Sequence, residues 1–332
     1  MRRSVTIVFF VFGVLSVKAQ QPFFSQFYNA SYTVNPAFTG TAYGYVRAGL
    51  NYKSYFNDFE QFQTTAGHVD LSLLENDRNP DYAGVGMAII HDQSGKAITN
   101  TKAMLSFAYH NAYGRSRNEF IAFGMQAGID NTNVDFTGLT TQNQWVNGIG
   151  FDPGLANGEN IESDNSTVVD FSAGFMWYKF LNNGASFNAG VSVYHLGRPG
   201  REFLGQKNPI ERRLSVHGSA RLPLTEVVNF APSLFYFFQG DEHTINPGGA
   251  IEFSLREESY FSLGVWARNL DVFIGAIQVE YANFILGASY DLLLSSISDE
   301  TRNGGFELSM SYLIKRTYKK RARIKSLRRP GL

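Results

Sequence analysis

Residues 119–131 read EFIAFGMQAGIDN, a stretch in which apolar residues alternate with small or polar ones. In a β-strand successive side chains point to opposite faces, so Phe123 and Met125 would lie on one face and Gln126 and Asp130 on the other. The stretch is longer than the roughly 5–6 residues of an average strand in a soluble protein. A long strand that is apolar on one face only is typical of a tilted strand that crosses a membrane.

The same alternation recurs along most of the chain and predicts fourteen antiparallel strands. An even number of strands returns both ends of a bacterial barrel to the same side of the membrane. We therefore predict an all-β transmembrane barrel in the outer membrane. A soluble β-sandwich or solenoid is the alternative, but no internal repeat of about 20–50 residues is visible. The strands are expected at residues 42–56, 60–74, 82–92, 98–112, 117–131, 167–181, 185–196, 210–222, 227–239, 245–256, 259–269, 273–281, 283–294 and 304–315.

The two ends of the chain depart from this pattern. Arg2 and Arg3 precede an apolar run that ends in the small residue Ala19, which predicts a cleaved export signal. No later stretch approaches the about 18–20 apolar residues of a membrane-spanning helix. We expect four regions: a signal peptide (1–19), a periplasmic or plug-like segment (20–41), the barrel (42–315) and a basic periplasmic tail (316–332).

Acidic and basic residues are equal in number, 29 each, but they are unevenly distributed. Residues 20–314 carry 17 basic and 29 acidic residues, whereas residues 315–329 carry nine basic residues and no acidic one. Such a tail is either a solvated extension or a binding site for an acidic periplasmic partner or anionic lipid headgroups. Nucleic acid is not an expected partner in that compartment. The candidate residues of the tail are Lys319, Lys320, Arg321 and Arg323.

The connections between the predicted strands fall into two classes. Every second connection is a short turn, for example at residues 181–184 and 281–283, and the intervening set includes long loops at 132–166 and 197–209. Outer-membrane barrels have short periplasmic turns and longer outer loops. This asymmetry predicts that both ends of the barrel domain lie in the periplasm.

The strand faces opposite the apolar ones carry charges of both signs. A lumen of this composition is either closed by ion pairs between its own walls or occupied by a polypeptide. The lumen-facing candidates are Arg47, Asp70, Asp130, Arg213, Arg268, Asp291 and Glu307.

Two short motifs follow the signal peptide, FFSQFY at residues 23–28 and VNPAFTG at residues 34–40, and the first strand then contains RAGLNY at 47–52. This ordered set resembles the start of the PorP/SprF family of type IX secretion membrane proteins from the Bacteroidetes. The resemblance continues over almost the whole mature chain. Its further elements are AGVG (83–86), AYH (108–110), FGMQAG (123–128), LGVWAR (263–268), LGASYD (286–291) and ELS (307–309).

The resemblance implies an outer-membrane partner of large secreted surface proteins, including gliding adhesins. Such a partner receives or retains the C-terminal domain of its type IX cargo, and other secretion-system components are further expected partners. Two other functions stay open: an outer-membrane channel for a small solute, and a component of the periplasmic secretion or motility complex.

The opening motifs also supply the candidate site residues. The Asn-Pro pair favours a turn with an extended residue before the proline. Aromatic residues of the motif are expected to pack against the periplasmic mouth or the lower lumen wall, so that the segment either seals the barrel or recognises a partner. The candidates are Phe24, Ser25, Gln26, Phe27, Tyr28, Asn35, Pro36 and Ala37.

The sequence carries no signature of catalysis. The six histidines are scattered, without a pair at metal-ligand spacing, and no serine-hydrolase, zinc-protease or phosphate-loop motif occurs. We therefore expect a non-enzymatic protein that needs no cofactor and no metal.

Overall fold

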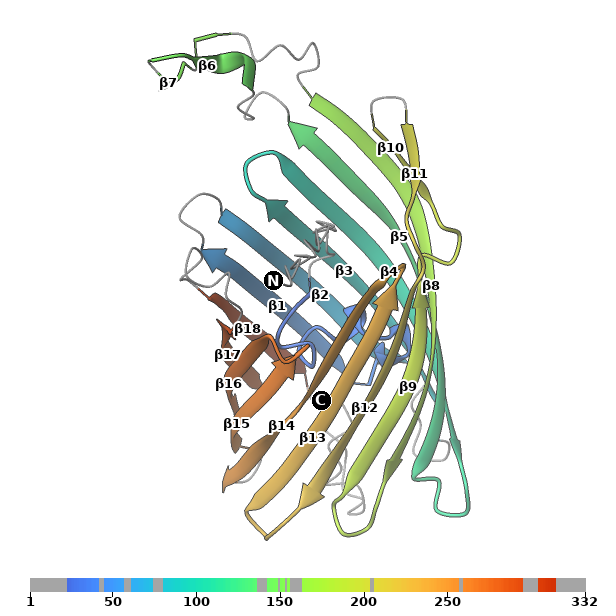
Figure 1. Cartoon of the computed structure of the whole chain (residues 1–332). Helices are drawn as coiled ribbons and strands as arrows, with labels where there is room; N and C mark the ends of the chain where they lie inside the picture. Colours follow the sequence, from blue (N-terminus) through green and yellow to red (C-terminus); the bar gives the residue numbers. More distant parts are fainter. Residues whose placement is uncertain are drawn as a thin grey trace, which may run out of the picture.

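The protein forms a closed antiparallel barrel of fourteen strands in a computed structural model, in which the last strand, β18, pairs with the first, β1 (Figure 1). The barrel strands are β1 (Val46–Phe56), β2 (Gln61–Leu73), β3 (Tyr82–Ser94), β4 (Ile98–Tyr113), β5 (Glu119–Asp135), β8 (Ser163–Phe180), β9 (Ser186–Tyr194), β12 (Arg213–Pro223), β13 (Val228–Gln239), β14 (Glu242–Arg256), β15 (Ser259–Arg268), β16 (Val272–Tyr281), β17 (Phe284–Leu293) and β18 (Gly305–Ile314). All fourteen predicted strands are confirmed, with bounds that differ by a few residues.

The structure describes residues 23–41, 45–56, 61–73, 80–135, 142–148, 150–152, 154–155, 163–203, 206–256, 259–294 and 304–314. The predicted signal peptide and the basic tail, with its candidates Lys319, Lys320, Arg321 and Arg323, lie outside the described residues.

The largest differences from the predicted bounds occur where β5 and β8 extend toward their connection. Asp135 pairs with Ser163, so this hairpin is four residues longer on each strand than the alternation predicts. The added residues, TNVD at 132–135 and SDNS at 163–166, are mostly polar on both faces, and the amphipathic signal therefore fades there. Two small hairpins were also not predicted, because their strands have only two or four residues: β6 (Trp145–Val146) with β7 (Gly150–Phe151), and β10 (Gly200–Phe203) with β11 (Gln206–Pro209).

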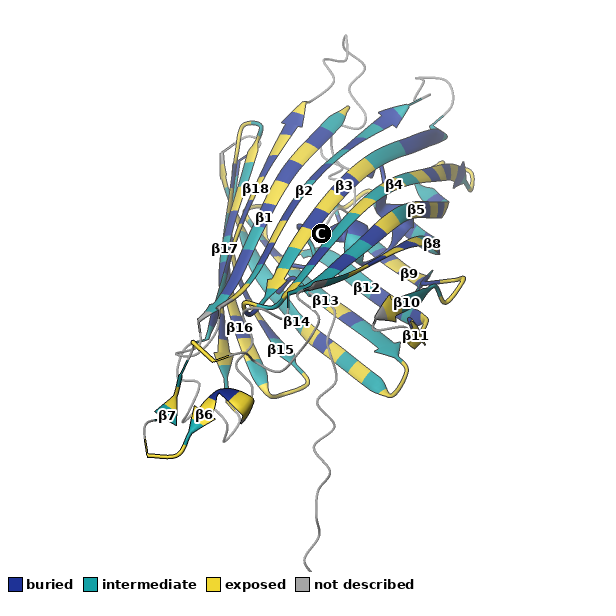
Figure 2. Cartoon of the chain, turned by 90° about the horizontal axis from the view of Figure 1, so that it is seen from above, coloured by how far each residue is buried: buried dark blue, intermediate teal, exposed yellow. Residues whose placement is uncertain are grey.

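The alternation of the sequence becomes an alternation of exposure around the barrel wall (Figure 2). On β5, Phe123 and Met125 are 61% and 65% exposed, whereas Ala122, which faces the lumen, is fully buried. On β18, Leu308 and Met310 are exposed and Glu307 and Ser309 are buried. The outer surface is thus apolar, as a barrel in a bilayer requires, and the inner surface carries buried residues, both polar and apolar.

The two rims of the barrel differ in the length of their connections. The end that carries the connections at residues 136–162, 195–212 and 294–304 is called here the long-loop end, and both small hairpins belong to it (Figure 1). The other end, where Val46 of β1 lies beside Ile314 of β18, is the short-turn end. None of the described helices is long or apolar enough to cross a membrane.

Residues 23–41, called here the N-terminal segment, lie inside the barrel (Figure 1). The segment includes two single-turn 3-10 helices, η1 (Ser31–Thr33) and η2 (Pro36–Phe38). Its side chains form two apolar clusters with inward-facing residues of the wall. The hydrophobic core of this protein is therefore the contact between the N-terminal segment and the lumen, because the other face of each strand points outward.

The outward face of β5 generates the first prediction. Met125→Arg places a charge in the middle of the apolar belt and should destabilise the folded barrel by about 2–4 kcal/mol. Urea titration of the protein refolded into lipid vesicles, followed by tryptophan fluorescence, measures this change. The control Leu155→Arg, at an exposed residue in the connection between β5 and β8, should have little effect. Equal unfolding midpoints for both variants would contradict a lipid-facing β5.

Candidate functional site

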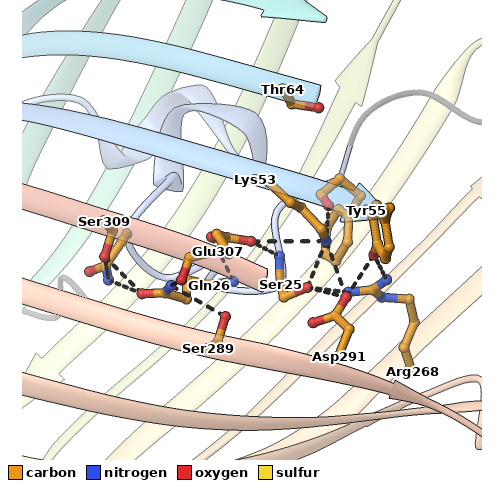
Figure 3. Close-up of polar contacts among 12 residues, drawn as sticks. Ser25, Gln26, Lys53, Tyr55, Thr64, Arg268, Ser289, Asp291, Glu307 and Ser309 are labelled. Atoms are coloured by element: carbon orange, nitrogen blue, oxygen red, sulfur yellow. Dashed lines mark hydrogen bonds and ion pairs between the residues drawn. The ribbon is translucent and has the colours of Figure 1, made fainter. Parts of the chain in front are cut away.

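Ser25 lies at the centre of a buried polar cluster (Figure 3). The wall residues of this cluster, Lys53, Arg268, Asp291 and Glu307, lie in the parts of their strands nearer the long-loop end. The Ser25 hydroxyl donates to Asp291 Oδ2 at 2.7 Å and accepts from Lys53 Nζ and Arg268 Nη2, each at 2.6 Å. One donor and two acceptor positions are all that a hydroxyl offers, so every one is used. Tyr55 Oη also donates to Asp291 Oδ2, at 2.6 Å.

Glu307 of β18 binds the backbone of the N-terminal segment at residues 25 and 26 (Figure 3). Its carboxylate accepts from the Ser25 amide at 2.6 Å and from the Gln26 amide at 3.1 Å. The Gln26 amide group donates in return to the Glu307 carbonyl at 3.0 Å. Asn29 extends this ladder by donating to Ser309 Oγ at 2.8 Å. Hydrogen bonds to a buried carboxylate are stronger than neutral ones, so this part of the segment is firmly held.

The four charged residues of this cluster require one another and the N-terminal segment. Lys53 Nζ lies 3.3 Å from Asp291 and 3.9 Å from Glu307, and Arg268 Nη2 lies 3.3 Å from Asp291. The side chains of Asp291 and Glu307 are only 1% exposed. Buried charges are tolerated only when they are paired and hydrogen-bonded, and Ser25 completes that pairing.

The aromatic residues of the opening motif pack on β13 and β15. The Phe23 ring stacks on Phe235 with centroids 5.1 Å apart, and the Phe27 ring lies 5.6 Å from the same ring. Tyr28 lies 5.1 Å from Trp266. Burial raises the pKa of the Tyr28 phenol far above its usual value, so this phenol is neutral.

This packing differs from the expected periplasmic position. Phe235 and Trp266 lie in the halves of their strands that approach the long-loop end. Phe24 packs in the same half, against Ala66 of β2 and Ile90 of β3. The expected contact of these rings with the lower lumen wall was therefore wrong. The segment begins in the half of the lumen nearer the long-loop end and reaches the short-turn end only at residues 39–40. No sequence pattern reveals this path.

The Asn-Pro-Ala motif forms the turn that its composition predicts. Asn35 Oδ1 accepts from the Ala37 amide at 2.9 Å, which caps η2. The other end of the same side chain donates to the carbonyls of Phe175 at 3.0 Å and Val191 at 3.1 Å. One asparagine therefore both shapes the turn and fixes it to β8 and β9.

Glycines of the wall make room for this turn. A Cβ on Gly124 would overlap the backbone of Pro36 and Ala37, and a Cβ on Gly174 would overlap the Asn35 side chain. Gly84 gives the same clearance to the Thr39 carbonyl. The N-terminal segment can lie this close to the sheet only because these strands lack a side chain at the points of contact.

The segment ends at the short-turn end with a second anchor. The Gly40 amide donates to Asp70 Oδ2 at 2.8 Å, while Asp70 Oδ1 accepts from Arg47 Nε at 2.7 Å. His110 Nε2 donates to the Thr39 carbonyl at 2.9 Å, since a carbonyl oxygen only accepts. Arg47 also reaches Ser31 Oγ at 3.2 Å.

The scattered motifs behind the family resemblance converge on this segment. AGVG and FGMQAG supply Gly84 and Gly124, and AYH supplies His110. LGVWAR supplies Trp266 and Arg268, LGASYD supplies Asp291, and ELS supplies Glu307 and Ser309. Elements that are far apart in the sequence thus share one physical task, which is to hold the opening motif in the lumen.

A second polar group lies above the segment toward the long-loop end. Asp130 Oδ2 is 3.2 Å from Lys102 Nζ and 2.8 Å from Arg201 Nη2, and Asn100 donates to Asp130 Oδ1 at 2.6 Å. Arg213 donates to the Thr33 carbonyl at 2.9 Å. Asp130 and Arg213 are among the lumen-facing residues predicted from the sequence, whereas Asn100, Lys102 and Arg201 are not. Arg201 belongs to a hairpin that carries no alternation, so no signal pointed to it.

The structure therefore divides the lumen-facing candidates into three groups. Arg268, Asp291 and Glu307 surround the start of the N-terminal segment, and Arg47 and Asp70 hold its end. Asp130 and Arg213 belong to the group above it.

The Ser25 cluster generates a prediction of stability. Ser25→Ala removes a hydroxyl that contacts three charged groups, and a hydrogen bond to a charged group contributes about 1.5–3 kcal/mol. We expect a loss of about 2–3 kcal/mol and faster chymotrypsin cleavage at the aromatic residues 23–28. The control Ser94→Ala, whose hydroxyl makes only a 3.1 Å bond to Asp92, should behave like the unmodified protein. Unchanged stability and cleavage in Ser25→Ala would show that this cluster does not hold the segment.

Comparison with solved structures places the barrel among known outer-membrane barrels. The chain is similar to the ΔS2 mutant of the TodX monoaromatic hydrocarbon channel, with a TM-score of 0.52 and 11% identity over 86% of this chain and 93% of that chain. It is also similar to the toluene transporter TbuX of Ralstonia pickettii, with a TM-score of 0.48 and 11% identity over 86% of this chain and 92% of that chain. At these identities the likeness to TodX shows the fold alone.

Comparison by sequence adds the family. No curated protein matches the chain. The family model described as type IX secretion system membrane protein PorP/SprF matches residues 16–312. Since the match spans most of the sequence, this outer-membrane barrel belongs to the PorP/SprF family of type IX secretion system membrane proteins.

Proposed function

We propose that this protein is a sealed partner barrel of the type IX secretion system. It supports secretion or cell-surface attachment of a secreted protein by binding the C-terminal domain of that protein, and this role needs no catalysis. The observation that carries the proposal is the occupied lumen: the N-terminal segment is held by buried contacts on all sides of the barrel.

The extent of these contacts argues against a solute channel. The segment contacts β17 and β18 through Ser25, β13 and β15 through its aromatic rings, and β8 and β9 through Asn35. Its end contacts β2 and β4 through residues 39–40. To open a path along the axis, these bonds would all have to break. The buried ion pairs of the wall would then lose the hydrogen bonds that offset their desolvation, which is costly.

The long-loop end is the rim that suits a partner. The three longest connections between barrel strands lie at this end, and two of them carry the small hairpins (Figure 1). Trp145 and Phe151 form an edge-to-face pair with centroids 5.5 Å apart on the β6–β7 hairpin, and both side chains are about half exposed. Exposed aromatic residues are typical of surfaces that bind other proteins.

The sealed lumen generates a prediction for planar lipid bilayers. The purified full-length protein should show no steady conductance. A variant that combines Ser25→Ala with Gly124→Ala and Gly174→Ala weakens the anchor and fills the space of residues 35–37, so it should conduct ions. The control Gly275→Ala adds a Cβ where no atom lies within 4 Å, and it should stay closed. Steady conductance of the unmodified protein would instead favour a solute channel.

The partner role generates a prediction in the native cell. Deletion of this protein should abolish the surface display or secretion of one partner protein, while other secreted proteins stay in place. Affinity purification from outer membranes should recover that partner through its C-terminal domain, and mass spectrometry identifies it. Unchanged display and secretion of every cargo after deletion would refute the proposed function.

A further inference from the structure

A small cavity lies between the N-terminal segment and the long-loop end. Its volume is about 50 Å³, enough for roughly four water molecules. Tyr32 and Thr33 of the segment form one side, and residues of β3, β4, β5, β8, β9 and β12, with His195 just after β9, form the rest. Because the segment separates this cavity from the short-turn end, a ligand would enter it from the long-loop side.

Cations outnumber anions in and beside this cavity. Lys102 and Arg213 line it together with the carboxylates of Asp130 and Asp170, and Arg201 of the β10–β11 hairpin contacts Asp130. Burial lowers the pKa of His195, which follows β9 and contacts Asp170 Oδ2 at 2.8 Å, so this histidine adds no full charge. Three cations therefore face two carboxylates, although residues 20–314 as a whole carry more acidic than basic residues.

Two polar atoms, one in the cavity lining and one beside the cavity, lack partners among the described residues. Arg201 Nε and Asp170 Oδ1 are buried and make no hydrogen bond. The first is a cationic donor and the second is an anionic acceptor, and an unmet buried polar atom costs free energy. An anionic acceptor would satisfy the first atom and an N–H donor would satisfy the second.

We propose that this cavity binds a carboxylate of a polypeptide that enters from the long-loop end. The carboxylate is held by Lys102 and Arg201, and the neighbouring peptide N–H donates to Asp170 Oδ1. The carboxylate belongs to the chain terminus or to an acidic side chain, since both offer the same chemistry. This inference rests on the proposed function, because it names the part of the partner that reaches the lumen.

Defined peptides test the proposal with the full-length protein in detergent micelles. The probe is a glycine pentapeptide with an uncharged fluorophore at its N-terminus, measured by fluorescence anisotropy. Three forms are compared: the free acid, the C-terminal amide, and the C-terminal amide with one internal glutamate. We expect the free acid to bind at least about tenfold more tightly than the plain amide, the factor for one charge-assisted hydrogen bond. Binding of the glutamate form identifies a side-chain carboxylate as a second source.

Two single variants assign the binding to this cavity. Lys102→Gln and Arg201→Gln lie on different elements, β4 and β10, and each should weaken binding of the free acid by about tenfold. The control Arg221→Gln removes a lumen cation that pairs with Glu252, away from the cavity, and should leave binding unchanged. Heat-modifiable mobility on gels verifies that each variant is folded.

Several outcomes would overturn the inference: no binding of the free acid at millimolar concentration, equal binding of acid and plain amide, or full binding by both cavity variants. The proposed function is tested separately by co-purification of a secreted protein with the unmodified barrel. That experiment can succeed while the peptides fail, so the two failures are distinguishable.

Discussion

One carboxylate, that of Glu307, organises the interior of this barrel. It accepts from two consecutive amides of the N-terminal segment, while its neighbours Lys53 and Asp291 complete the charge pairing around Ser25. The charges inside the wall pair with one another, as Lys53 does with Asp291 and Glu307, and the N-terminal segment adds hydrogen bonds to these pairs. A buried ion pair needs such further hydrogen bonds to offset the cost of its desolvation. The segment and the buried charges therefore stabilise each other.

The wall and its contents differ in how far the sequence predicts them. Alternation along residues 119–131 identifies β5 and its two faces, because a strand in a bilayer must repeat every second residue. The same rule gives the inward position of Asp291 and Glu307. Their common partner Ser25 lies 266 and 282 residues away in the sequence, and no periodicity links such positions. The boundaries fail where the rule no longer applies, at the polar ends of β5 and β8.

The opening motif shows the same division. Asn35 and Pro36 predict a turn from local chemistry, and the turn is present. The position of Phe27 depends instead on the course of the whole segment, and the expected lower-wall contact was wrong. Glycines such as Gly124 stand at points of contact that the sequence does not mark. In the sequence they do not differ from other small residues of a strand. Only the structure shows that the backbone of the N-terminal segment lies against them.

The location of Ser25 beside the junction of β1 and β18 has a consequence for biogenesis. Its binding partners come from β1, β15, β17 and β18, so they include the first strand and the last two strands to leave the ribosome. The pocket for Ser25 therefore does not exist until the C-terminal strands have met the N-terminal one. Insertion of the segment must accompany or follow closure of the cylinder, so a protein that is truncated near its C-terminus would leave its own first residues without a place to bind.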